Sequence, residues 1–114
     1  GTSERRLSQT LAQVQALVAR GAVRVSDHGY DELAEDGILV SDILDSIANA
    51  IVVEDYPDAV RGPTVLVLQR DAANEPVHIV WAIPRDRTEP AVLVTAYRPE
   101  RDRWSSDFMR RKPK

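Results

Sequence analysis

The amino-acid sequence predicts an α+β domain in which three N-terminal helices pack on a four-stranded antiparallel sheet, followed by a short C-terminal helix. Apolar residues recur at helical spacing through the first 50 positions, and this period changes to short strand-like runs from residue 51 onward. These runs follow one another closely, so neighbours should pair antiparallel, because parallel neighbours need a long crossover. With 114 residues, the chain has the length of one ordinary domain.

Helix-capping residues divide the first half of the chain into three segments. The candidate N-caps are Thr2 or Ser3, then Ser26, then Ser41. Gly21 ends the first segment, and a short extended piece at 22–25 leads to the second. The expected helices therefore lie at about 4–20, 27–36 and 42–49.

Four strands are expected after the helices, at 51–55, 64–70, 77–83 and 91–97. Apolar residues alternate onto both sides of these strands, so both faces of the sheet need to be covered. The three helices can cover one face. The other face needs either a second subunit or the C-terminal segment with Trp104 and Phe108, where a short helix is expected from Ser105 or Ser106 to about Arg111.

Composition and charge exclude several classes of protein. The chain has no cysteine, which excludes a disulfide framework and a cysteine-based zinc site. No apolar run exceeds five residues, far short of the ~20 that a membrane helix needs, so we expect a cytoplasmic protein without membrane contact. Residues 1–60 carry a net charge of −7 and residues 61–114 one of +4, so the basic groups gather toward the C-terminus.

The basic groups near the C-terminus are candidates for binding RNA phosphates. Arginine outnumbers lysine 13 to 2 in the chain, and a planar guanidinium suits phosphate better than an ammonium does. The candidate RNA-binding residues are Arg101, Arg103, Arg110 and Arg111. The alternative is a terminal segment that only solubilises the protein.

The two histidines, His28 and His78, are candidates for general acid–base chemistry, since imidazole titrates near neutral pH. His28 lies near the start of a helix, and His78 lies inside a strand. The alternative for each is a packed imidazole with a backbone partner. His28 shares a helix face with Glu32, but no third metal ligand is identifiable, so we expect neither a metal nor a cofactor.

The last expected strand ends in a hydroxyl, a phenol and a guanidinium, at Thr95, Tyr97 and Arg98. Strand ends hold side chains rigidly toward adjoining loops and are favoured places for sites. Thr95 and Tyr97 should share a face, and Arg98 can neutralise a phosphate oxygen in a transition state. The alternative is a tyrosine at the edge of the core and an arginine on the surface.

Five motifs in order resemble the bacterial domain of unknown function 4258 family. They are Val25-Ser26-Asp27-His28, Gly37-Ile38-Leu39-Val40-Ser41-Asp42-Ile43, Val77-His78-Ile79-Val80, Ala96-Tyr97-Arg98-Pro99 and Trp104. The resemblance covers about residues 22–112 of the expected single domain 1–114 and leaves residues 1–21 outside as an N-terminal helix extension.

The resemblance implies a layout like that of the RelE-type ribonuclease toxins of toxin–antitoxin modules. Metal-independent RNA cleavage would then take place at a site lined by His28, His78, Thr95, Tyr97 and Arg98. One histidine would act as base on the ribose 2′-hydroxyl, and Arg98 would stabilise the phosphorane charge. A protein antitoxin would be the partner, and RNA the substrate.

Two positions depart from this pattern. The family usually has arginine where this chain has Glu32 and Asp36, and two carboxylates repel a polyanion. Two functions are therefore expected: a ribonuclease-like toxin domain of weakened or lost activity, or a non-catalytic module. The second would bind a protein partner, or a second copy in a homodimer, through an apolar sheet face. On the first function, His28 and Tyr97 should lie in one cleft.

Overall fold

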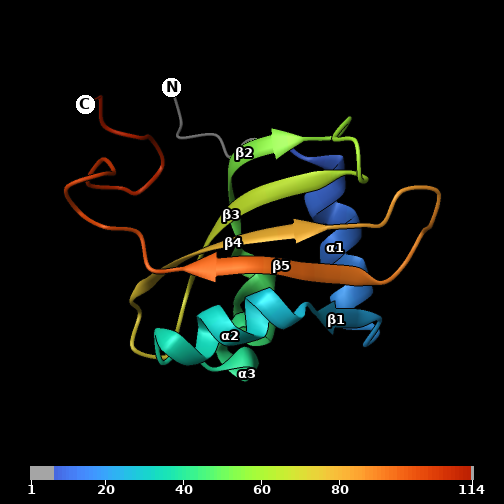
Figure 1. Cartoon of the computed structure of the whole chain (residues 1–114), viewed down its shortest axis with the longest axis horizontal. Coiled ribbons are helices and arrows are strands. Elements are labelled where there is room, and N and C mark those ends of the chain that lie inside the picture. Colours follow the sequence, from blue (N-terminus) through green and yellow to red (C-terminus); the bar gives the residue numbers. More distant parts are fainter. Residues whose placement is uncertain (1–6, 114) are drawn as a thin grey trace.

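The computed structural model describes residues 7–113 as a five-stranded sheet with helices packed on one face and the C-terminal segment on the other (Figure 1). The elements in chain order are α1 (Gln9–Ala19), β1 (Val23–Val25), α2 (Asp27–Glu35), α3 (Val40–Ser46), the 3-10 turn η1 (Ile47–Asn49), β2 (Ile51–Tyr56), β3 (Thr64–Arg70), β4 (Pro76–Ala82) and β5 (Ala91–Tyr97). The α+β class and the helices ahead of the main strands agree with the prediction.

The sheet differs from the predicted four antiparallel strands. Its order is β1-β5-β4-β3-β2, and β1 pairs parallel with β5, from Val23 opposite Ala91 to Val25 opposite Leu93. The other three pairings are antiparallel, as expected. The extended piece at 22–25 was therefore expected as a connection but is an edge strand. Its partner lies at the far end of the chain, and the intervening helices and strands provide the long crossover that a parallel pair requires.

The predicted helix from Ser105 or Ser106 to Arg111 is not formed. Residues 98–113 run as turns, with one bridge between Trp104 and Arg111. Phe108 has a φ of 63°, in the left-handed region, which interrupts a right-handed helix. Trp104 and Phe108 instead pack on the sheet, and both are only 4% exposed. The burial of these two rings, rather than helix propensity, therefore determines the conformation of the segment.

The helix boundaries follow from their caps. Ser8 caps α1 by accepting a hydrogen bond from the N–H of Leu11 at 3.1 Å, so α1 starts later than the predicted residue 4. The other candidate caps, Thr2 and Ser3, lie outside the described residues. Ser26 caps α2 as predicted, accepting from the N–H of Gly29 at 2.9 Å. The third helix starts at Val40 rather than 42, and its last turn is the 3-10 turn η1.

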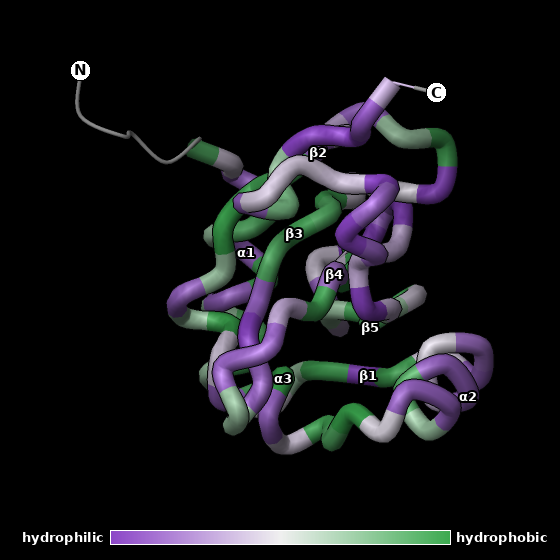
Figure 2. The backbone as a smooth tube through the Cα atoms, turned by 90° about the vertical axis from the view of Figure 1, so that its left-hand side faces the viewer, coloured by the Kyte–Doolittle hydropathy of each residue, from purple (hydrophilic) through white to green (hydrophobic). Residues whose placement is uncertain are grey.

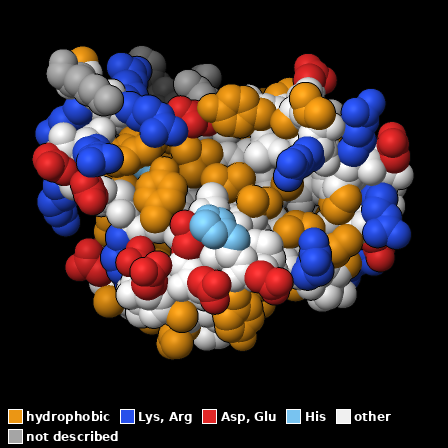
Figure 3. Space-filling view, in the orientation of Figure 1, with side chains coloured by type: hydrophobic (Ala, Val, Ile, Leu, Met, Phe, Trp, Pro, Cys, Tyr) orange, Lys and Arg blue, Asp and Glu red, His pale blue; other side chains and the backbone are white. Residues whose placement is uncertain are grey.

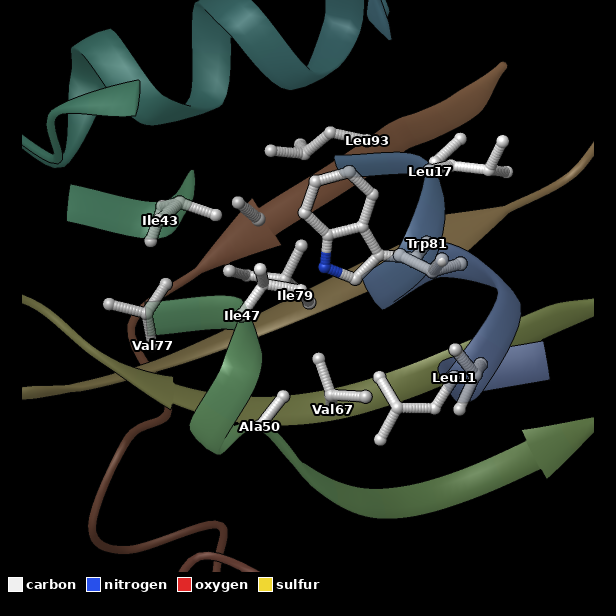
Figure 4. Packing of buried hydrophobic residues seen from close by; sticks show 14 of the residues in the cluster. Leu11, Leu17, Ile43, Ile47, Ala50, Val67, Val77, Ile79, Trp81 and Leu93 are labelled. Carbon is white, nitrogen blue, oxygen red and sulfur yellow. The ribbon is translucent and has the colours of Figure 1, made fainter. Parts of the chain in front are cut away.

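The main core lies between the sheet and the helices α1 and α3 (Figure 4). Trp81 is fully buried there, and its indole N–H donates to the side-chain oxygen of Gln69 at 2.9 Å. The Gln69 amide in turn donates to the carbonyl of Ile43 at 2.8 Å, which ties α3 to β3. These bonds satisfy the polar atoms that the core encloses.

A second, smaller cluster lies on the opposite face of the sheet. There Trp104 and Phe108 pack on Val53, Leu66 and Leu68. The C-terminal segment therefore covers the face that the sequence left to it or to a second subunit. Hydropathy follows this arrangement, with a hydrophobic β3 in the interior and a mostly hydrophilic α2 outside (Figure 2). Between residues 7 and 113, no helix combines the length and the apolar character needed to cross a bilayer.

Candidate functional site

Helix α2 packs closely along the edge of β5, where β1 has already ended. The backbone N–H of Ser26 donates to the carbonyl of Leu93 at 3.0 Å, and the Ser26 hydroxyl donates to that of Val94 at 2.8 Å. Gly29 allows this approach, because a Cβ at its position would lie 2.9 Å from both Cδ2 and the carbonyl oxygen of Leu93. The helix thus continues the hydrogen bonding of the strand edge.

Two carboxylates, those of Glu32 and Asp36, bind the same strand edge. Glu32 Oε1 accepts from the N–H of Ala96 at 3.0 Å and from the hydroxyl of Thr95. Asp36 Oδ2 accepts from the N–H of Arg98 at 3.3 Å. An arginine has no acceptor and cannot make these bonds. In this chain the two positions therefore have a structural use for a carboxylate, separate from any effect on RNA.

His28 is on the first turn of α2, and its side chain is 72% exposed. Its Nε2 lies 3.4 Å from Oε2 of Glu32, the carboxylate whose other oxygen is bound by β5. Within residues 7–113, no hydrogen bond to Nδ1 of His28 is formed. The result is an accessible imidazole beside an anchored carboxylate, with one ring nitrogen open to solvent.

His78 has the opposite environment, because it is fully buried under the C-terminal segment. Its Nε2 donates to the carbonyl of Phe108 at 2.8 Å, which leaves Nδ1 to accept from the phenol of Tyr97 at 3.1 Å. Its ring also meets that of Trp104 edge-on, with centroids 4.3 Å apart. Burial lowers the pKa of His78 below its usual value. His78 is therefore a packed, neutral imidazole with both nitrogens in use, the alternative considered from the sequence.

Thr95 and Tyr97 share a face of β5, as expected for alternate residues of a strand, and a bulge precedes them. Trp81 pairs with Leu93 and Val80 with Thr95, so one residue of β5 between them has no partner. Burial raises the pKa of the Tyr97 phenol, which keeps it protonated at neutral pH. Tyr97 is therefore a hydrogen-bond donor and a ring surface rather than a base.

The side chain of Arg98 contacts the turn before β4. Its guanidinium pairs with Asp71 at 2.8 Å and reaches the carbonyl of Pro76 at 3.5 Å. The N–H of Glu75, together with Arg98, holds the pKa of the Asp71 carboxyl below its usual value. Arg98 thus fastens the end of β5 to the turn before β4. A role on a phosphate would require this half-buried pair to open.

Arg111 fixes the C-terminal segment to β2. Its guanidinium lies 3.2 Å from Oε1 of Glu54 and 4.7 Å from the centroid of the Trp104 ring. This pairing lowers the pKa of the Glu54 carboxyl. One of the four arginines expected to bind RNA therefore already has a carboxylate and an aromatic partner.

The other three candidate RNA-binding arginines are all exposed. Arg101 lies over the Phe108 ring, 5.4 Å from its centroid. Arg103 pairs with Glu100 at 3.1 Å, and both side chains are mostly exposed, so this pair contributes little and exchanges readily. Within the described part of the chain, Arg110 forms no ion pair through its side chain. Arg103 and Arg110 are thus the most available of the four.

A groove of about 930 Å³ opens where β5 passes into the C-terminal segment. Figure 3 shows hydrophobic side chains on this side of the molecule next to both Lys or Arg and Asp or Glu side chains. The lining residues are Asp36, Tyr97, Arg98, Glu100, Asp102, Arg103, Trp104, Arg111, Lys112 and Pro113. Tyr97 lines this groove and His28 does not, so the expected common cleft for these two residues stays a prediction.

The structure therefore gathers the predicted site residues into two pairs. His28 meets Thr95 through Glu32, and His78 meets Tyr97 directly. Both pairs involve one face of β5, whereas Arg98 belongs to neither. The contact by which Glu32 joins α2 to β5 is not predictable from the sequence, because no local pattern connects residues so distant along the chain. Among residues 7–113, no three histidine or acidic side chains are placed to hold a metal ion.

Comparison with known proteins gives one match. The family model described as "Domain of unknown function (DUF4258)" matches residues 25–98, which include β1's last residue, both histidines and the whole of β5. No curated protein and no solved structure matches the chain.

Proposed function

This chain belongs to the DUF4258 family, as its motifs predict, and on that premise we propose that it is a small bacterial toxin-like domain with weak, metal-independent endoribonuclease activity. The observation that carries this proposal is the exposed imidazole of His28 beside Glu32, whose carboxylate is held by β5. An imidazole oriented by a fixed carboxylate is the usual arrangement of a general base.

The reaction needs His28, Glu32 and a water molecule. The Glu32 carboxylate accepts a hydrogen bond from the Nε2–H of His28, which leaves the Nδ1 lone pair to take the proton of a ribose 2′-hydroxyl. The 2′-oxygen then attacks the adjacent phosphorus, the bond from phosphorus to the 5′-oxygen breaks, and that oxygen takes a proton from water. The hydroxide left behind takes the proton from the His28 imidazolium, which restores the base. The products are a 2′,3′-cyclic phosphate and a 5′-hydroxyl end.

Charge accounts for the weakness of the proposed activity. Helix α2 carries Asp27, Asp31, Glu32 and Glu35 and no lysine or arginine. These carboxylates lie on the same short helix as His28 and oppose the approach of a phosphate backbone, most strongly at low ionic strength where the repulsion is least screened. The exposed basic groups of the C-terminal segment offset this repulsion at the other end of β5.

Cleavage of single-stranded RNA by the purified chain tests the proposal. His28→Ala should lower the cleavage rate about 10²- to 10⁴-fold, the usual effect of losing a general base. Glu32→Gln keeps an acceptor for the Ala96 N–H and should have a smaller effect on the rate. Asp31→Asn, on the same helix and without an ion pair among the described residues, is the matched control and should not lower the rate.

Growth of bacteria provides a second readout. The chain expressed without its neighbouring gene should slow growth, and His28→Ala should relieve this effect. A protein antitoxin, if encoded next to this gene, should restore growth when expressed together with the wild type. A wild type that neither slows growth nor cleaves RNA, or cleavage that His28→Ala leaves unchanged, contradicts the enzyme proposal.

The bonds at His78 and Arg98 favour a second candidate, a non-catalytic module that binds a protein. Both nitrogens of His78 and the guanidinium of Arg98 are used within the fold. The apolar sheet face first considered for a partner or a homodimer is covered by residues 98–113, so a partner would need another surface. The exposed side chains of Tyr30 and Leu39, 60% and 63% exposed, offer one. Sedimentation of the purified chain distinguishes monomer from homodimer.

A further inference from the structure

We propose that the groove beside the C-terminal segment binds one nucleotide of single-stranded RNA next to the phosphate that is cleaved. This inference rests on the proposed function, because it places substrate in relation to His28. It goes further by assigning a separate binding site, with an aromatic platform for the base and basic side chains for the phosphate.

The groove is in the right place for a neighbouring nucleotide. Helix α2 runs alongside β5, with Glu32 bound at Ala96 and Asp36 bound at Arg98. Thr95, which contacts the carboxylate beside His28, lies two residues before Tyr97, which lines the groove. Alternate residues of a strand lie about 7 Å apart. We therefore place a ribose at His28 and the next unit of an RNA strand that follows β5 at the groove.

Tyr97 provides the surface on which a base can stack. Its phenol is directed to the buried His78 and its ring lines the groove, so one end of the side chain is fixed while the ring forms part of the wall. Trp104 is only 4% exposed and is covered by Arg111, so it cannot serve in the same way. Aromatic rings bind bases of any sequence in this manner.

Basic side chains in the groove can take the phosphate. Lys112 lines it and forms no ion pair among the described residues, and Arg103 is held only by an exposed pair with Glu100. Such a pair exchanges its carboxylate for a phosphate at small cost, because both side chains already face water. A guanidinium binds a phosphate through two parallel hydrogen bonds.

Carboxylates in the same groove favour a nucleotide over inorganic phosphate. Asp36 and Asp102 line the groove, and their negative charges would repel inorganic phosphate. They are acceptors for the amino groups of bases, as in the pairing of acidic side chains with the cytosine amino group. A ring, cations and acceptors together match the three parts of a nucleotide.

Binding of a short 2′-O-methyl RNA, which cannot be cleaved, tests the site without relying on catalysis. Tyr97→Leu should raise the dissociation constant about 5- to 100-fold, the loss expected for one stacked base. Tyr97→Phe retains the ring and should bind nearly as the wild type does. Tyr30→Leu removes an exposed tyrosine outside the groove and is the matched control. Arg103→Glu and Lys112→Glu change exposed side chains, so their expected loss of binding does not depend on refolding of the core.

The outcomes separate this inference from the proposed function. RNA binding that depends on Tyr97, Arg103 and Lys112 supports the groove, even if the wild-type chain does not cleave RNA. Equal binding by Tyr97→Leu, Tyr97→Phe and the double charge reversal overturns it, even if the chain cleaves RNA. Displacement of the RNA by inorganic phosphate at concentrations similar to those needed for 5′-AMP also overturns it, since the groove would then recognise phosphate only.

Discussion

The two histidines of this chain contact the same strand from opposite environments. His28 reaches β5 through Glu32 from an exposed helix, whereas His78 lies in β4 beneath the C-terminal segment and binds the Tyr97 phenol. Both belong to motifs of the family, and either can be cast as a general base from the sequence. They differ because His28 is exposed and has a ring nitrogen without a hydrogen bond among the described residues, whereas His78 is buried and both of its ring nitrogens are bonded. The role of a titratable residue thus depends on its hydrogen-bond partners and solvent access rather than on its type.

Replacing each histidine with alanine tests most directly whether the two imidazoles have different roles. His78→Ala should lower the free energy of unfolding by about 3–5 kcal/mol, because it opens a cavity and leaves the Tyr97 phenol and the Phe108 carbonyl without partners. His28→Ala should change it by less than about 0.5 kcal/mol, as for other exposed positions. Urea unfolding followed by tryptophan fluorescence measures both. Similar losses for the two variants would refute the assigned roles.

The sequence predicted the local elements well and the long-range pairings poorly. Ser26 marked the start of α2 correctly, and the predicted ranges 64–70 and 91–97 are those of β3 and β5. These features depend on local caps and apolar runs. The strand at Val23–Val25 was missed because three residues carry little periodicity and its partner is distant in sequence.

The candidate site was predictable only in its residue types. The possibility of a packed His78 was considered, but its partner Phe108 was placed in a helix that does not form, so the covering of His78 could not be foreseen. Glu32 and Asp36 were judged by charge alone. Their bonds to the N–H groups of Ala96 and Arg98 depend on α2 lying against β5, which no nearby pattern reveals.

The close contact of α2 with β5 can be loosened at Gly29. Gly29→Ala should lower the free energy of unfolding by about 1–3 kcal/mol, because the added Cβ meets the side chain and carbonyl of Leu93 at 2.9 Å. Without this contact the substitution should be favourable by about 1 kcal/mol, since alanine is the better helix former. Asp31→Ala on the exposed face is the control. A Gly29→Ala protein more stable than the wild type would contradict the close approach.

The pH dependence of stability sharpens the contrast between the histidines. The unfolded chain binds a proton on each imidazole near pH 6.5, whereas burial lowers the pKa of His78 in the folded chain. Protonation of His78 therefore does not lower the free energy of unfolding above about pH 6.5. As the pH falls from there to the lower pKa of the folded state, the free energy of unfolding decreases by at most about 1.4 kcal/mol per pH unit. Urea midpoints between pH 7.5 and 5 measure this loss. His28→Ala should show the same loss of stability at low pH. If the loss disappears in this variant, His28 rather than His78 causes it.

The smallest expected effect concerns how the C-terminal segment is held over His78. Arg111→Ala removes the pair with Glu54 and the contact with the Trp104 ring. Both interactions are partly exposed to solvent, so their combined loss should lower the free energy of unfolding by only about 1 kcal/mol. Arg110→Ala is the matched control, since its guanidinium forms no ion pair among the described residues, and should have no measurable effect. Hydrogen exchange then locates the change. Faster exchange at residues 104–111 with unchanged exchange in α2 would show that Arg111 holds the C-terminal segment over His78 without affecting the surroundings of His28. Equally faster exchange in both regions would mean that the two faces of the sheet open together.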